Sequence, residues 1–143
     1  MKVVVDANII FSALIKGNPV YIKILNNVDA YAPDFIFIEL EKYEKRILKK
    51  ASNRQRMKEI IYKIFKKISI IPKIGLTKAN IKKAYSLCKD IDEKDTPYVA
   101  LTLELDAYLW TNDKKLTNNL REKGFSKILT TDELIKIIQL EEK

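Results

Sequence analysis

The chain has 143 residues, 47% of them hydrophobic, which is the length and composition of one compact folded domain. It contains no histidine and one cysteine, Cys88, so a histidine general base, a His/Cys zinc site and an intramolecular disulfide are excluded. The 27 Lys and Arg residues against 19 Asp and Glu residues give a net charge of +8, which favours a polyanion such as nucleic acid as a partner.

Short apolar runs alternate with helical patterns through the first half of the chain. Strands are expected at residues 2–5, 29–32 and 68–71, ended by Asp6, Pro33 and Pro72. The helices expected between these strands lie at 8–16, at 20–25, in one long helix opened by Pro33-Asp34 with an apolar stripe from Ile36 to Ile47, and from about Arg54 to Phe65.

The same alternation continues through the second half of the chain. Strands are expected at 107–110 and 127–129, and helices at 77–89, at 96–105, from Asn112 or Asp113 to 123, and from a cap at Thr131 onward. Strands that alternate with helices predict a parallel sheet covered by helices on both faces. Cys88 falls on an apolar helical face and is expected to be buried. Core packing is also expected for the tyrosines at positions 21, 43, 62 and 85, with a protein-contact surface as the alternative.

Two further patterns are absent from the sequence. No apolar run approaches the roughly 18 residues of a membrane span, and no signal peptide precedes the first strand, so we expect a cytoplasmic protein without membrane association. There is also no GxGxxG or GxxxxGK motif, and this argues against an enzyme that cradles a nucleotide phosphate in a glycine-rich loop.

Acidic residues recur at strand ends and in first helical turns. Asp6 follows the first strand, and Asp113 comes just after the strand at 107–110. Ligands of open parallel sheets bind beyond the carboxyl ends of the strands, where the strand order reverses. If the first and fourth strands are neighbours there, Asp6 and Asp113 flank one crevice.

Two more acids join this set by their place on helices. Glu39 lies on the N-terminal half of the long helix, about 7.5 Å nearer the strand end than Glu44, while Glu41 points away from the apolar stripe. Asp95 directly precedes the helix at 96–105. Helix capping or a solvated surface position stays open as an alternative explanation for each acid.

Four convergent carboxylates would need protons or a cation. Two carboxylates 4 Å apart repel by about 4 kcal/mol at an effective dielectric constant of 20. Because the chain offers no histidine and only one cysteine, oxygen is the ligand atom left, and a hard divalent ion such as Mg²⁺ or Mn²⁺ is expected.

A basic stretch runs from the second half of the long helix into the helix that begins at about Arg54. It suits contact with a nucleic-acid backbone, although a solvated surface is the alternative. Its members that we assign to RNA binding are Lys45, Arg46, Lys49, Lys50, Arg54, Arg56 and Lys58.

Four segments in this order resemble the PIN-domain family, metal-dependent nucleases that include the toxin ribonucleases of VapBC-type modules: VVVDANIIFSALI, APDFIFIELEKYEKRI, DEKDTPYVALTLELDAYLWT and NDKKL. The resemblance spans essentially the whole chain. It implies a single nuclease domain over 1–143, with an α/β/α sandwich around a central parallel sheet of about five strands in the order 3-2-1-4-5. It also implies homodimerisation and, for a toxin, a cognate antitoxin protein.

The resemblance also assigns site residues. The family's acidic centre falls on Asp6, Glu39, Asp95 and Asp113, with Asp92 as an additional acid. The polar supporting positions fall on Asn8, Ser12 and Thr111.

The leading hypothesis is therefore a Mg²⁺- or Mn²⁺-dependent endoribonuclease. One alternative is a non-catalytic module that binds RNA or a protein. Another is a phosphoryl-transfer domain of receiver or dehalogenase type, which also places acids at strand ends. A dehalogenase-like pattern would have a second Asp two residues after Asp6, where this chain has Asn8.

Overall fold

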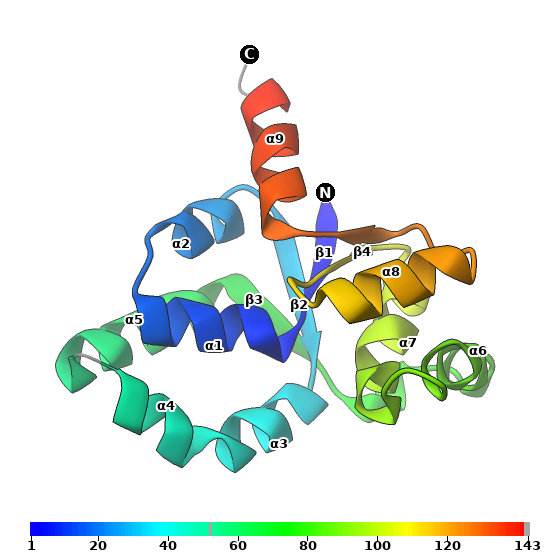
Figure 1. Cartoon of the computed structure of the whole chain (residues 1–143), viewed down its shortest axis with the longest axis horizontal. Helices are drawn as coiled ribbons and strands as arrows, with labels where there is room; N and C mark the ends of the chain where they lie inside the picture. Colours follow the sequence, from blue (N-terminus) through cyan, green and yellow to red (C-terminus); the bar gives the residue numbers. More distant parts are fainter. Residues whose placement is uncertain (52, 142–143) are drawn as a thin grey trace.

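The computed structural model describes residues 1–51 and 53–141 and is built around a parallel sheet (Figure 1). The five strands are β1 (Lys2–Val5), β2 (Asp29–Pro33), β3 (Ile68–Ile71), β4 (Tyr108–Trp110) and β5 (Ile128–Leu129). They pair in the order β3-β2-β1-β4-β5, and every pair is parallel. The expected α/β fold and strand order are confirmed.

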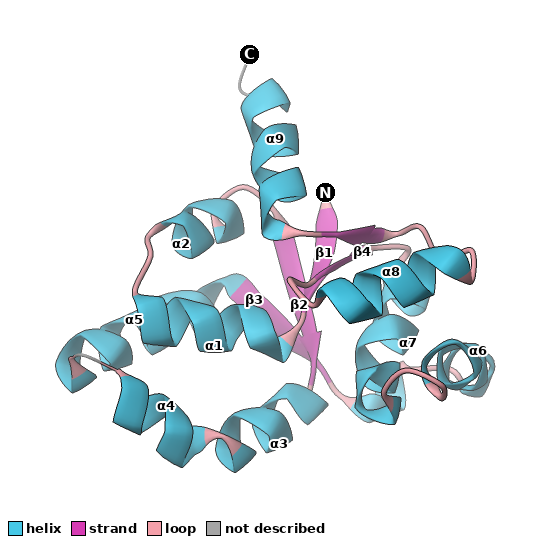
Figure 2. Ribbon diagram, viewed as in Figure 1, coloured by secondary structure: helices cyan, strands magenta, loops and turns pink. Residues whose placement is uncertain are grey.

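Helices cover both faces of this sheet (Figure 2). The helices before β3 lie on one face: α1 (Ala7–Lys16), α2 (Val20–Leu25), α3 (Phe35–Lys42), α4 (Glu44–Lys50) and α5 (Arg54–Lys67). Those on the other face are α6 (Lys78–Cys88), α7 (Thr96–Leu105) and α8 (Lys114–Glu122). Helix α9 (Thr131–Glu141) follows β5, and two 3₁₀ turns, η1 (Lys73–Gly75) and η2 (Glu93–Asp95), precede α6 and α7. None of the described helices is long and apolar enough to cross a membrane.

The helix expected as one long element after Pro33 is divided in two. Tyr43 has φ −101° and ψ 9°, outside the helical region, and separates α3 from α4. Its ring packs edge-on against Phe11 of α1, with 5.3 Å between the ring centroids. Apolar periodicity continues across the break, with Ile36 and Ile47 both buried, so the sequence pattern does not reveal it.

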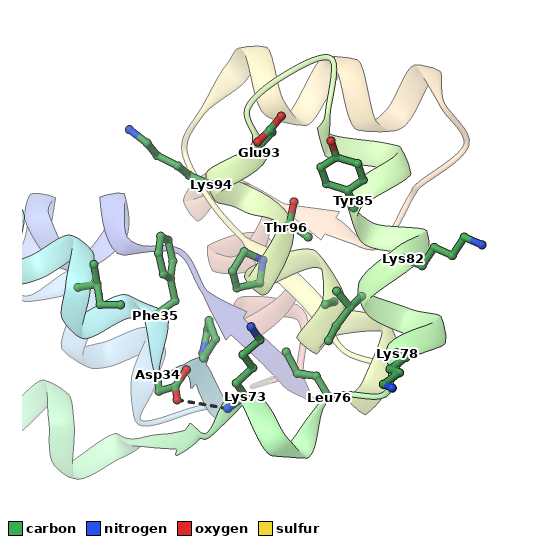
Figure 3. A pocket seen from close by; sticks show the side chains of 15 residues that line it. Asp34, Phe35, Lys73, Leu76, Lys78, Lys82, Tyr85, Glu93, Lys94 and Thr96 are labelled. Carbon is green, nitrogen blue, oxygen red and sulfur yellow. Dashed lines mark hydrogen bonds between the residues drawn. The ribbon is translucent and has the colours of Figure 1, made fainter.

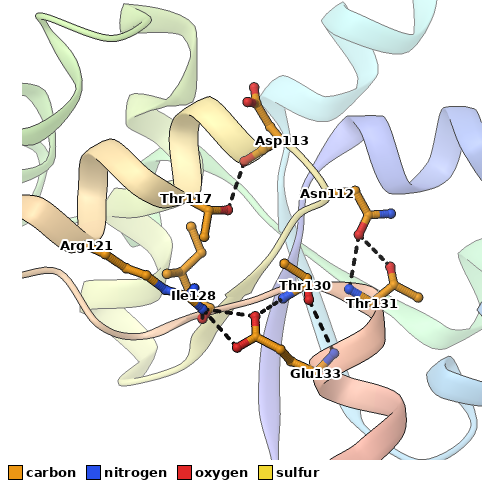
Figure 4. A network of polar contacts seen from close by, with 8 residues as sticks. All are labelled: Asn112, Asp113, Thr117, Arg121, Ile128, Thr130, Thr131 and Glu133. Atoms are coloured by element: carbon orange, nitrogen blue, oxygen red, sulfur yellow. Dashed lines mark hydrogen bonds and ion pairs between the residues drawn. The ribbon is translucent and has the colours of Figure 1, made fainter.

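The cap of α9 is Thr130, where Thr131 was predicted. Thr130 Oγ1 accepts a hydrogen bond from the Glu133 amide at 3.3 Å, and Glu133 Oε1 accepts one from the Thr130 amide at 3.0 Å. This reciprocal pair is a capping box. Thr131 instead donates its hydroxyl to Asn112 Oδ1 at 2.8 Å (Figure 4), which ties the loop after β4 to the start of α9.

The core lies between the sheet and its two helical layers. Cys88 is fully buried, as predicted, and so is Tyr21. Two tyrosines expected in the core are instead on the surface: Tyr62 is 67% exposed and Tyr85 is 46% exposed. Both lie on helices that bury only a narrow side, Met57 and Ile64 on α5 and Ala84 and Cys88 on α6, so their aromatic character alone misassigned them to the core.

Candidate functional site

An acidic cavity of about 400 Å³ opens at the carboxyl ends of β1 and β4. The Asp6 amide donates to the Trp110 carbonyl at 3.0 Å, which continues the pairing of β1 with β4 and brings the two strand ends together. Five carboxylates line the cavity, two of them from η2 and its cap: Asp6, Glu39, Asp92, Asp95 and Asp113. All the acids proposed from the sequence therefore border one cavity.

Asp6 is held at the base of the cavity by Thr111. The Thr111 hydroxyl donates to Asp6 Oδ2 at 2.7 Å and accepts from Asn8 Nδ2 at 3.2 Å and from the Asp113 amide at 3.1 Å. Burial, with smaller contributions from the charges of Glu39 and Asp113, raises the pKa of Asp6 to about 6. Ser12, the third predicted supporting residue, lines the cavity from α1.

Asp95 is the acid most affected by its surroundings. Burial, followed by the charges of Asp6 and Asp92, raises its pKa to about 8. Asp92 accepts a hydrogen bond from the Lys94 amide at 3.0 Å, and the Asp95 amide donates to the Asp92 carbonyl at 3.1 Å. These bonds fix the η2 turn, so both carboxylates are attached to a defined backbone.

Glu39 reaches the cavity from α3, whereas Glu41 and Glu44 border a separate hollow with Leu40 and Leu48. Tyr98 Oη donates a hydrogen bond to Glu39 Oε1. Burial raises the pKa of Glu39, and this hydrogen bond partly offsets that rise. Tyr98 was not identified from the sequence. It lies three residues after Asp95, the cap of α7, so the two residues are on the same side of the first turn of that helix.

Asp113 has two roles in the structure. Its Oδ1 accepts from the Leu116 amide at 3.0 Å, so it caps α8, and its carbonyl accepts from the Thr117 hydroxyl at 2.8 Å (Figure 4). The capping expected as an alternative reading is therefore present together with the place at the cavity. Further along α8, Arg121 donates to the Ile128 carbonyl at 3.0 Å, which joins this helix to β5.

The structure divides the basic stretch. Arg46 and Lys50 of α4 line the acidic cavity, one helical turn apart. The remaining candidates are exposed but do not line the cavity: Lys45, Lys49, Arg54, Arg56 and Lys58. The two basic side chains suit an anionic substrate, and the carboxylates beside them suit a cation bound next to that substrate.

The donor atoms at the cavity suit a hard divalent ion. They are oxygens throughout, and Asn8 Oδ1 is buried without a hydrogen-bond partner in the described residues. Among residues 1–51 and 53–139, whose side chains the structure describes, no three acidic side chains are close enough together to enclose a metal ion. Mg²⁺ needs no such enclosure, because it commonly binds through one or two carboxylates and keeps several waters. The residues present therefore fit Mg²⁺ or Mn²⁺.

The chain belongs to the PIN domain family, whose model matches residues 4–133. Its structure is similar to a chain in the crystal structure of VapBC2 from Rickettsia felis bound to a DNA fragment from their promoter. The TM-score is 0.59 at 15% sequence identity, and the match covers 91% of this chain and 97% of that chain. At this identity the similarity establishes a shared fold. A search of curated proteins gave no match.

Proposed function

We propose that this PIN domain, as a single unit spanning residues 1–143, is a metal-dependent endoribonuclease that hydrolyses RNA phosphodiester bonds. The observation that carries the proposal is the cavity where five carboxylates meet two basic side chains, Arg46 and Lys50. Carboxylates at such density are costly without a cation, and cationic side chains beside them favour a phosphate-bearing substrate.

Asp6, Asp95 and Asp113 would hold one or two Mg²⁺ or Mn²⁺ ions, with Glu39 as a ligand or as the residue that orients water, and Asp92 as an additional acid. Bound metal supplies Lewis-acid stabilisation of the attacked phosphate and makes water at the site more acidic. Thr111 keeps Asp6 in one orientation, since its hydroxyl is itself fixed by Asn8 and Asp113.

The basic residues of α4 and α5 would hold the RNA backbone. Arg46 and Lys50 line the acidic cavity and would contact a phosphate close to the carboxylates. The remaining five would contact more distant phosphates, where they add affinity without selecting a sequence.

A toxin role, with a cognate antitoxin as the protein partner in the cytoplasm, is part of this proposal. It is supported by the fold shared with a chain of a VapBC complex. We also propose a homodimer, since Phe37 (48% exposed) stacks on Phe65 of α5 with 5.7 Å between centroids, and Tyr62, three residues before Phe65 on that helix, is exposed as well. Light scattering of wild type against Phe37→Ser would test the dimer.

The decisive experiment is cleavage of a mixed pool of structured and single-stranded RNA in Mg²⁺, Mn²⁺ or EDTA. Wild type is compared with Asp6→Asn and with Asp29→Asn, an exposed acid at the opposite end of the sheet. Metal-dependent cleavage that is lost in Asp6→Asn and kept in Asp29→Asn is the expected result. RNA bound equally by all three proteins, with no cleavage in any metal, would favour a non-catalytic binding module.

A further inference from the structure

A second, larger hollow borders the η2 turn (Figure 3). It measures about 860 Å³ and runs between the start of α3, the η1 turn, α6 and the first turns of α7. The η2 turn forms a wall of both hollows: Asp92 and Asp95 face the acidic cavity, whereas Glu93 and Lys94 line this groove.

The floor of the groove is apolar and open to solvent. It is formed mainly by Phe35, Ile38, Leu76, Ile81 and Tyr85. Ile38 is 60% exposed, and Ile74 in the adjoining η1 turn is 93% exposed. Several exposed apolar side chains in one patch indicate an interaction surface, because leaving such a patch in contact with water is unfavourable.

The margin of the groove is basic. Four lysines line it, Lys73, Lys78, Lys82 and Lys94, against two acids, Asp34 and Glu93, but the Lys94 side chain points away from the groove (Figure 3) and lies near Glu39 and Asp92. Asp34 is already engaged, since its Oδ2 accepts from the Lys73 amide at 3.2 Å. In the described part of the chain none of the four lysines forms an ion pair. Figure 3 shows Lys73 reaching into the groove and Lys78 and Lys82 at its edge.

From this combination we infer that the groove docks an acidic amphipathic segment of a partner protein. Apolar side chains of the segment would cover the floor, and its Asp and Glu residues would pair with Lys73, Lys78 and Lys82. Lys78 and Lys82 are four residues apart on α6, so they lie on one side of that helix. A partner helix with acids at the same spacing would match both.

Charge argues against a second copy of this chain as the occupant. A symmetric contact centred on this groove would bring its lysines close to the same lysines of the other copy. RNA is also disfavoured, because the floor is largely aliphatic and Phe35 is already packed edge-on against Tyr98, at 6.3 Å between centroids. The inference does not depend on the chain being a nuclease.

The test selects a ligand without assuming its sequence. A phage-displayed library of random peptides of about twelve residues, enough for three helical turns, is panned against the full chain. The selected peptides are then measured by fluorescence anisotropy against wild type, Lys78→Glu/Lys82→Glu and Ile38→Ser. The matched control is Lys63→Glu/Lys67→Glu, a pair of exposed lysines with the same spacing on α5.

We expect peptides that combine apolar residues with Asp or Glu, bound about tenfold more weakly by Lys78→Glu/Lys82→Glu and by Ile38→Ser, with the α5 control close to wild type. The inference is overturned by failure to select any peptide, by selection of basic peptides, or by equal binding to the groove variants. It is also overturned if those variants instead lose affinity for single-stranded oligouridylate, or if they abolish self-association of the chain.

Discussion

Tyr98 donates a hydrogen bond to Glu39, and the pair connects α7 to α3 across the edge of the acidic cavity. Tyr98 is 1% exposed, so its ring is fixed by packing, and Phe35 lies edge-on to it. Glu39 is therefore oriented by a buried neighbour. This makes Tyr98 a positioning residue for the proposed nuclease.

Tyr98→Phe should lower the RNA cleavage rate by about tenfold with little change in RNA affinity, because Glu39 loses the group that orients it. The phenylalanine ring fills the same space, so the free energy of unfolding should fall by only about 1 kcal/mol. The hydrogen bond holds the pKa of Glu39 down, and its loss should move the acidic limb of the pH–rate profile to higher pH.

Tyr62→Phe is the matched control, since Tyr62 is 67% exposed on α5. An equal loss of rate in both variants, or an unmoved pH profile in Tyr98→Phe, would show that Tyr98 serves the fold alone.

The metal-free protein should lose stability as the pH rises. The pKa of Asp95 is about 8 in the folded chain against an ordinary value of 3.8. The folded state thus holds a proton that the unfolded state releases between about pH 4 and 8, so the free energy of unfolding falls across that window. In EDTA, Asp95→Asn should melt above wild type near pH 8, by about 3 °C for each 1 kcal/mol, and the difference should shrink toward pH 4.

Thermal melts over that pH range check this, with Asp29→Asn as a variant that removes an exposed carboxylate. A melting temperature for Asp95→Asn below that of wild type at every pH would contradict the burial and crowding of this carboxylate.

Divalent metal should restore the stability that the crowded acids remove. Mg²⁺ at about 100 times its dissociation constant stabilises a folded protein by about 2.7 kcal/mol. The shift should be larger near pH 8 than near pH 5, because protons compete for Asp6 and Asp95, whose pKa values are about 6 and 8. The melting temperature with and without Mg²⁺ measures this stabilisation. An equal rise in melting temperature for Asp6→Asn would mean that the ion binds elsewhere.

The sequence predicted the parts of the site that follow strands. Asp6 and Asp113 each come after an apolar run, and such a pattern can be recognised in the sequence without knowledge of the fold. The strand order that joins them came from the family resemblance, since nothing in the spacing of β1 and β4 fixes their pairing. The hydrogen bond from Tyr98 to Glu39 joins residues 59 positions apart, so only the folded chain reveals it.

The break at Tyr43 had a different cause. Periodicity reports which residues face the core, and Ile36 and Ile47 both do, so one helix and two helices give the same pattern. Arg46 and Lys50 of α4 line the acidic cavity, while Lys45 and Lys49 stay outside its lining. The charge pattern in the sequence does not separate these four residues, because which of them line the cavity depends on how α4 is oriented after α3.

Arg46→Ala/Lys50→Ala should therefore reduce both RNA binding and cleavage more than Lys45→Ala/Lys49→Ala does. Each phosphate contact removed should lower the slope of log affinity against log salt by about 1, so both pairs weaken binding in a salt-dependent way. Only the first pair borders the carboxylates, and its cleavage rate at saturating RNA should fall as well. Binding by anisotropy across a salt series and single-turnover cleavage separate the two effects. Equal loss of saturated rate in both double variants would mean that the basic stretch acts as one diffuse surface, with no special place for Arg46 and Lys50.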